Sequence, residues 1–188
     1  MNMNDNIKNL KTIQLKEVPW DRMNSFSENS SDLPKLIEIL QKDISSQSAL
    51  DALNKIEKMI EKDNKLCQST PFALVFLIEY FGRLSINPDL SITECEILDN
   101  LKDFFEVVVD DFMIAEEKYD ASKLNDFSEM ISEKYLLVNK NQKIVFSDEV
   151  IFSFYYYSYK IIVDMIERLK HYENFLPERI VTELSEII

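Results

Sequence analysis

Residues 91–113 read SITECEILDNLKDFFEVVVDDFM, and this stretch decides the fold class. Ser91 and Glu94 have the spacing of a capping box, in which each side chain accepts a hydrogen bond from the other residue's backbone N–H. Apolar residues then recur at steps of three and four, the spacing of one helix face: Leu98, Leu101, Phe105, Val108 and Phe112. The stretch therefore predicts a helix from about residue 92 to 113 with one buried stripe.

Helical spacing continues toward the N-terminus. It predicts a short helix over residues 33–40 and a second helix that buries Ala49, Leu50, Leu53, Ile56 and Ile60. Ser69, Thr70 and Pro71 open a third helix, which is apolar all round and is therefore expected at the centre of the fold. Gly82, the only glycine of the chain, is expected to end that helix in a left-handed conformation.

Toward the C-terminus the same spacing predicts three more helices. A fifth helix carries Leu124, Phe127, Met130 and Ile131. A sixth starts at Ser147 and ends near His171, a base whose charge suits the helix dipole there. A seventh starts at Pro177 and turns four residues inward: Ile180, Val181, Leu184 and Ile187. Between residues 135 and 146 the apolar residues no longer follow helical spacing. This segment is predicted to be either a small β-hairpin or an ordered loop.

The predicted fold class is all-α, in a single domain over residues 1–188. Residues 1–30 form a polar N-terminal segment, and residues 31–188 form helical repeats. Helix starts near residues 33, 71 and 122, each followed by a second helix, indicate antiparallel helix pairs at a period of roughly 40 to 50 residues. This period is typical of a HEAT-like stack.

Composition excludes several classes of function. Lys and Arg number 21 against 34 Asp and Glu, so the formal charge of −13 argues against direct binding of nucleic acid or of an anionic membrane and favours a basic partner. One glycine is too few for a phosphate-binding loop or a dinucleotide fingerprint, and one histidine excludes an HExxH zinc site. The sequence thus indicates no enzyme activity and no cofactor, and it does not specify an oligomeric state.

The cysteines and the chain ends point to the cytoplasm. Cys67 and Cys95 form no CxxC pair and are expected to be inert thiols in a reducing compartment. The first sixteen residues lack the apolar core of a secretory signal, and no apolar run has the length of a membrane span. We therefore expect a cytoplasmic protein with no membrane partner.

The strongest local signal is a row of five carboxylates on the helix predicted at residues 92–113. They recur at steps of three and four on the side opposite the apolar stripe: Glu96, Asp99, Asp103, Glu106 and Asp110. Residues 91–120 hold ten acidic and two basic side chains, a net charge of −8 out of −13. We expect this row to face outward.

Three interpretations of this row remain open. It is a solvated helix face, or a docking surface for a cationic partner. The third is a site for Mg²⁺ or Ca²⁺ at Asp110 and Asp111 or at Glu116 and Glu117, although no EF-hand loop supports it.

A second candidate surface lies on the sixth predicted helix, which is rich in aromatic residues. Besides a core-facing stripe, it has a second stripe that contains Phe152, Tyr156, Tyr159 and Val163. The side chains of this stripe are buried by neighbouring helices, or Tyr156 and Tyr159 form an exposed anchor for a partner.

The first part of the chain resembles a known family. Trp20 is followed by a helix that begins Asp32-Leu33-Pro34, by a helix with Ala49 and Leu50, and by the segment Ser69-Thr70-Pro71-Phe72. This pattern resembles the N-terminal helix pairs of bacterial HEAT-like repeat proteins over residues 20–81, with Ser69 where that group has alanine and Val75 where it has proline.

The resemblance implies a right-handed stack of helix pairs that binds other macromolecules. Small acidic proteins of this kind are common among the immunity proteins of contact-dependent inhibition and polymorphic toxin systems. It therefore suggests an immunity protein that covers the substrate site of a basic toxin domain, with a nuclease as the expected toxin class. The alternative is a helical scaffold that self-associates or binds a peptide through the tyrosine-rich helix.

Overall fold

The structure is a computed structural model that describes residues 13–27, 30–42, 46–139 and 144–170. Its fold is all-α, as the sequence predicts. The α-helices are α2 (Leu33–Lys42), α3 (Gln47–Ile60), α4 (Thr70–Ser85), α5 (Ile92–Lys118) and α6 (Asp148–Lys170). Short 3-10 helices are η2 (Leu15–Glu17), η3 (Trp20–Arg22), η4 (Ser30–Asp32), η5 (Phe127–Ile131) and η6 (Glu133–Tyr135).

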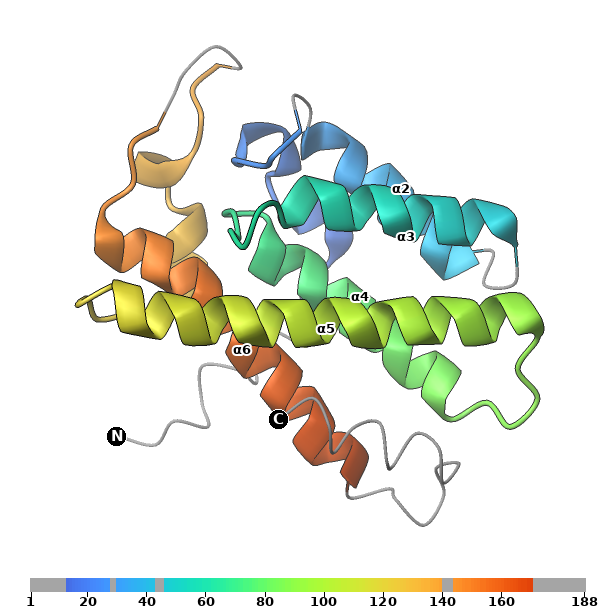
Figure 1. Ribbon diagram of the computed structural model, residues 1–188. Coiled ribbons are helices and arrows are strands. Elements are labelled where there is room, and N and C mark those ends of the chain that lie inside the picture. The colour runs from blue at the N-terminus through green and yellow to red at the C-terminus, as the bar shows by residue number, and fades with distance from the viewer. Residues whose placement is uncertain (1–12, 28–29, 43–45, 140–143, 171–188) are drawn as a thin grey trace.

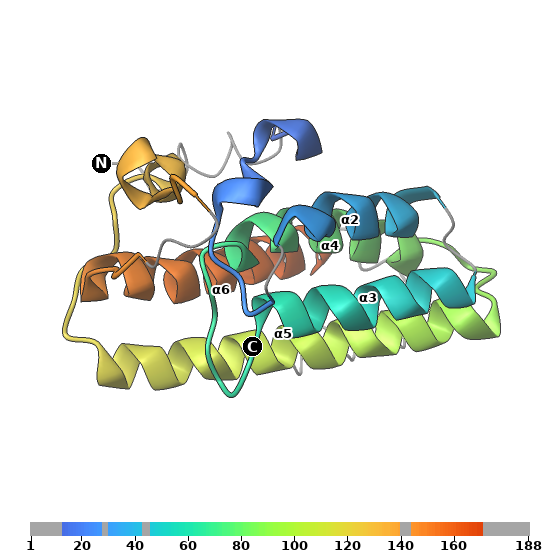
Figure 2. The same ribbon diagram turned by 90° about the horizontal axis from the view of Figure 1, so that it is seen from above.

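The α-helices form two layers. Helices α2, α4 and α6 run in one direction and pack in that order, and α3 and α5 run side by side in the opposite direction (Figure 1). The view from above shows α3 and α5 together on one side of the molecule (Figure 2). Helix α4 contacts α6 more extensively than it contacts α5, its neighbour in the chain. The HEAT-like class of this stack remains a prediction.

Helix α5 confirms the sequence prediction and extends one turn beyond it. The Ser91 hydroxyl accepts a hydrogen bond from the Glu94 N–H at 3.3 Å, and the Glu94 carboxylate accepts one from the Ser91 N–H at 2.7 Å. This capping box fixes where the helix begins. The whole predicted stripe from Leu98 to Phe112 is buried.

Helix α4 is central, because both its layer neighbours and α5 cover it. Ten apolar or aromatic residues of α4 that are buried or partly buried contribute to the core, which explains the absence of a polar face in this helix. Gly82 does not end the helix. It lies inside α4, which continues to Ser85, and it has no positive φ. The predicted left-handed cap is therefore wrong, and Gly82 occupies a position that any residue with helical propensity suits.

Gly82→Ala should consequently stabilise the protein by about 0.5–1 kcal/mol, because glycine loses more backbone entropy than alanine in a helix interior. A Cβ atom built at Gly82 meets nothing within 4 Å, so no clash offsets this gain. Urea unfolding of the two proteins measures the difference. A destabilised variant would contradict the helical assignment of Gly82.

Residues 119–139 depart from the prediction. The expected fifth helix is limited to the single 3-10 helix η5, so the third helix pair expected from residue 122 does not form. Nor is there a β-hairpin, because Tyr135 lies in η6, and residues 136–139 and 144–147 are not in strands. Residues 140–143 of the possible hairpin, His171 and the seventh predicted helix lie outside the described residues.

One buried amide holds this irregular segment in place. Gln68 is completely buried, and its Oε1 accepts a hydrogen bond from the Asn24 N–H at 3.0 Å. Its Nε2 donates to the carbonyl oxygens of Met130 at 2.6 Å and Tyr135 at 3.1 Å. Gln68 thereby joins the segment before α2 to η5 and η6. The segment predicted to be polar, residues 1–30, also contributes Val18, Trp20 and Met23 to the core.

Candidate functional site

The five carboxylates of the predicted row lie on the outer face of α5. Glu96, Asp103 and Asp110 are exposed, and Asp99 and Glu106 are half-buried. Their spacing repeats close to the helical period, so the side chains rise along one side of α5 while the apolar stripe faces α4 and α6. Lys102 lies 3.8 Å from Glu106, and this half-buried pair offsets one of the five negative charges of the row.

Helix α3 adds two carboxylates to the same surface. Because α3 and α5 run side by side, Glu57 and Glu61 of α3 lie across a groove of about 350 Å³ from Asn100 and Asp103 of α5. Lys58 also lines the groove. We call this surface the acidic face and define it by seven residues: Glu57, Glu61, Glu96, Asp99, Asp103, Glu106 and Asp110.

Sequence reasoning missed the contribution of α3. Lysines alternate with glutamates on the outer side of this helix, so its charge appears balanced in the sequence. Glu57 and Glu61 are spaced four residues apart, the only local signal that they share a face. That this face borders the row on α5 depends on how the two helices pack, which the sequence does not specify.

Within the acidic face, Glu57 is the carboxyl group whose pKa departs most from its ordinary value. Its Oε1 is buried and has no hydrogen-bond partner among the described residues. Burial raises the pKa of Glu57 to about 7, Lys58 opposes the shift, and Asp103 and Glu61 add to it. At neutral pH this carboxyl is therefore partly protonated, and a cation placed in the groove would favour its ionised form.

Asp111 is not part of the acidic face, although it neighbours Asp110 in the sequence. Its side chain is 1% exposed, and its Oδ2 lacks a hydrogen-bond partner in the described part of the chain. Burial raises the pKa of Asp111 to about 7, with smaller contributions from Glu61 and Asp110. Asp110 and Asp111 thus point into different environments, and they do not converge on one ion.

Among residues 13–27, 30–42, 46–139 and 144–170, no group of three or more His, Cys, Asp or Glu side chains has the arrangement that a metal ion needs. The predicted pair Glu116 and Glu117 lies exposed in the last turn of α5. Carboxylates of the acidic face are spread along two helices instead of around a point.

Tyr156 and Tyr159 of α6 are half-buried and pack against α5. The Tyr159 ring stacks on Phe112 with centroids 4.3 Å apart and an interplanar angle of 11°. Tyr156 meets the same Phe112 ring edge-on at 6.3 Å, and Lys123 lies 5.0 Å over the Tyr156 ring. These contacts place both tyrosines in the α5–α6 interface, where they stabilise the fold.

Tyr159→Ala should therefore lower the free energy of unfolding by about 1–2 kcal/mol, since it removes a stacked pair and half-buried apolar area. Urea unfolding of the variant tests this. Tyr159→Phe is the control, because it keeps the stacked ring and should change stability much less. Equal stability of wild type and Tyr159→Ala would show that the ring is free for a partner.

Cys67 and Cys95 are both free thiols. Cys67 is buried, and burial raises the pKa of its thiol although Ser69 and Thr70 offer hydrogen bonds that lower it. A thiol with a raised pKa is a poor nucleophile. Cys67 therefore acts as a small core residue.

Comparison with protein-family models, with curated proteins and with solved structures finds no match to this chain. No helix in the described part of the chain combines the length and the apolar character that a membrane span requires.

Proposed function

We propose that this protein binds a basic protein partner through the acidic face. The observation that carries the proposal is the alignment of seven carboxylates on two adjacent helices, α3 and α5, with few cations among them. Like charges at i and i+4 each cost about 0.2–0.5 kcal/mol in a helix. A cationic partner would convert this repulsion into attraction, and complementary charge raises the association rate and rejects wrong partners.

The groove between α3 and α5 supplies a specific attachment point within this surface. A Lys or Arg side chain inserted there would meet Glu57, Glu61 and Asp103 and would pair with the buried Oε1 of Glu57. Hydrogen bonds between ionised groups are stronger than neutral ones. The groove thus favours a protein partner with protruding basic side chains.

The partner class that we propose is a nuclease toxin domain, with this protein as its immunity protein. A nuclease cleft has to be basic in order to hold phosphates, and a row of carboxylates about 5–6 Å apart occupies the same Lys and Arg side chains. The sequence resemblance to bacterial HEAT-like repeat proteins, whose small acidic members are common among toxin immunity proteins, supports the same class. Binding alone would inhibit such a toxin, so the proposal assigns no enzyme activity, and the two free thiols fit a reducing cytoplasm.

Capture from the host cell tests this proposal. The full chain, the variant Asp99→Lys/Asp103→Lys/Glu106→Lys and a control variant Asp21→Lys/Asp89→Lys/Asp120→Lys are used as baits at low salt. The control residues are exposed, lie outside α3 and α5 and give the same change in net charge. The proposal expects a basic protein on the wild type and the control but not on the α5 variant. Recovery of the same proteins by all three baits would contradict it.

A further inference from the structure

Helix α5 carries exposed apolar side chains among the carboxylates of the acidic face. Val107, Met113 and Ile114 are 39%, 54% and 48% exposed. Single exposed apolar residues are ordinary on a protein surface, whereas a group of them rimmed by polar residues marks an interaction site. These three lie within two turns of one charged helix, so the acidic face has an apolar component that charge alone does not explain.

The groove beside α3 shows which side of α5 two of these residues occupy. Asn100, Phe104 and Val107 line the groove from α5. Successive residues of an α-helix lie about 100° apart, so Val107 and Ile114 are rotated about 40° and 20° from Asp103 toward this groove. Both side chains therefore face the space above the α3–α5 contact.

Carboxylates flank these two apolar side chains on both sides. Glu106 and Asp110 are rotated about 60° and 20° from Asp103 in the opposite direction, away from α3. On the other side, Glu57 and Glu61 of α3 line the groove. The surface thus consists of an apolar strip between two rows of negative charge.

The spacing within the apolar strip fits a helix. Val107 and Ile114 are seven residues apart, a rise of about 10.5 Å along α5, and a partner helix presents its residues i and i+7 at the same spacing on one face. We infer that α3 and α5 bind a basic amphipathic helix of the partner protein. Its apolar stripe covers Val107 and Ile114, and its flanking Lys and Arg side chains pair with the carboxylates on either side. The inference rests on the proposed function and specifies the element of the partner that makes the contact.

Charge selects this occupant over a second copy of the same chain. The chain has a net charge of −13, so a copy placed on the acidic face would bring like charges together, which costs binding energy. A basic amphipathic helix instead meets opposite charge at both edges and apolar side chains at the centre. An apolar centre with a polar rim is the usual layout of a protein–protein interface.

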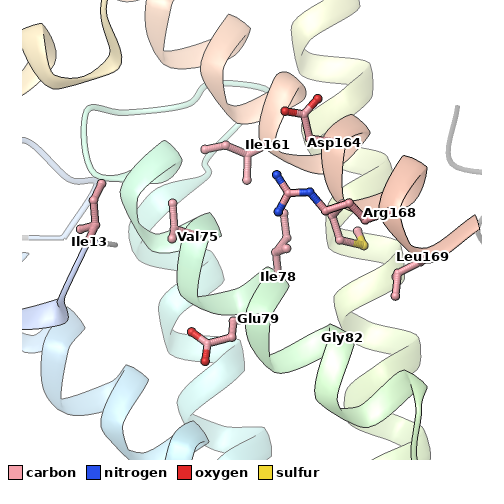
Figure 3. Close-up of a pocket in the computed structure, with 10 residues that line it drawn as sticks. Ile13, Val75, Ile78, Glu79, Gly82, Ile161, Asp164, Arg168 and Leu169 are labelled. Atoms are coloured by element: carbon pink, nitrogen blue, oxygen red, sulfur yellow. The ribbon is translucent and has the colours of Figure 1, made fainter. Parts of the chain in front are cut away.

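A second apolar hollow lies between α4 and α6 and suits such a helix less well. It has a volume of about 390 Å³, and Val75 of α4 and Ile161 of α6 line it (Figure 3). The charged residues at its edge have both signs: Glu79, Asp164 and Arg168. The basic rows of an amphipathic helix would therefore meet both attraction and repulsion there.

Two synthetic helical peptides of equal charge test the inference. Both carry two rows of lysine, and the stripe between the rows is leucine in one peptide and alanine in the other, which preserves helical propensity. Calorimetric titration of the full chain measures the two Kd values. We expect the leucine peptide to bind at least about tenfold more tightly, because its stripe buries apolar surface against α5.

A variant of the apolar strip locates the bound peptide. Val107→Ala/Ile114→Ala should weaken binding of the leucine peptide about fivefold and should leave the Kd of the alanine peptide nearly unchanged. The matched control is Ile86→Ala/Val145→Ala, which removes the same side-chain atoms from exposed residues outside α3 and α5. This control should change neither Kd.

The outcomes separate this inference from the proposed function. If both peptides bound the wild type equally and Asp99→Lys/Asp103→Lys/Glu106→Lys abolished both interactions, the acidic face would stand and the apolar stripe of the partner would be wrong. Leucine-peptide binding that Val107→Ala/Ile114→Ala does not weaken would place the peptide elsewhere and would also overturn the inference. So would self-association of the wild type that this variant removes, because the strip would then bind a second copy. Binding of neither peptide to the wild type would contradict both proposals.

Discussion

The variant Asp99→Lys/Asp103→Lys/Glu106→Lys should bind a basic partner about a hundredfold more weakly than the wild type, a loss of about 3 kcal/mol. Each substitution replaces an attraction with a repulsion at the centre of the acidic face. Folding should change little, because all three side chains lie on the outer side of α5. The new lysines at positions 99 and 106 gain partners in Glu96 and Asp110, which offsets the loss of the Lys102–Glu106 pair. Calorimetric titration with the captured partner measures the loss, and thermal unfolding checks the fold.

The control variant Asp21→Lys/Asp89→Lys/Asp120→Lys separates this surface from total charge. It has the same net charge as the α5 variant but leaves the acidic face intact. Its affinity should therefore fall much less, because these charges lie outside the interface and are screened by salt. An equal loss in both variants would mean that binding depends on net charge alone.

Asp111→Asn should make the protein about 2–4 kcal/mol more stable at pH 8 while changing its stability little at pH 4. The wild-type carboxyl is buried, and its pKa of about 7 in the fold lies far above that of an exposed aspartate. Each unit of pKa difference corresponds to about 1.4 kcal/mol. Asparagine has nearly the same shape and never ionises, so it removes this cost.

The sign of the pH dependence follows from the raised pKa. Below pH 4 Asp111 is protonated in both the folded and the unfolded chain, so its burial does not lower the free energy of unfolding through loss of a charge. As the pH rises toward 7, the unfolded chain loses this proton first, so stability falls and then levels off above pH 7. Glu57 contributes a fall over the same range, because its pKa is also about 7.

Urea unfolding at pH 4, 6 and 8 measures this dependence, and Asp110→Asn is the matched control. Asp110 is the exposed neighbour on α5, so its substitution should leave the stability difference between pH 4 and pH 8 nearly as in the wild type. If Asp111→Asn retained the full wild-type pH dependence, Asp111 would not be the buried group responsible.

The sequence predicts the helices well where local chemistry marks their ends. The Ser91 and Glu94 capping box starts α5, and Pro71 lies in the first turn of α4, so both helices begin where the sequence indicates. The outward orientation of the row from Glu96 to Asp110 also follows from helical period alone. These features need no knowledge of tertiary contacts.

Other features depend on contacts that local patterns do not reveal. The segment around Phe127 has helical spacing, but Gln68 and the Tyr157 hydroxyl bind its backbone and flanking carbonyls in a 3-10 conformation. Glycine favours helix ends, so Gly82 indicates a cap in the sequence, whereas α4 continues past it to the buried residues Leu84 and Ser85. The groove beside Glu57 forms only because α3 and α5 pack against each other, and local sequence patterns do not specify this packing.

The salt dependence of binding tests the central claim most directly. The Kd of the captured partner is measured from about 50 to about 500 mM NaCl for the wild type and for Asp99→Lys/Asp103→Lys/Glu106→Lys. If the acidic face is the interface, the wild-type Kd should rise at least about tenfold over this range, because salt screens the opposed charges. The variant should bind weakly at every salt concentration. Equal, salt-independent Kd values for the two proteins would contradict the assignment.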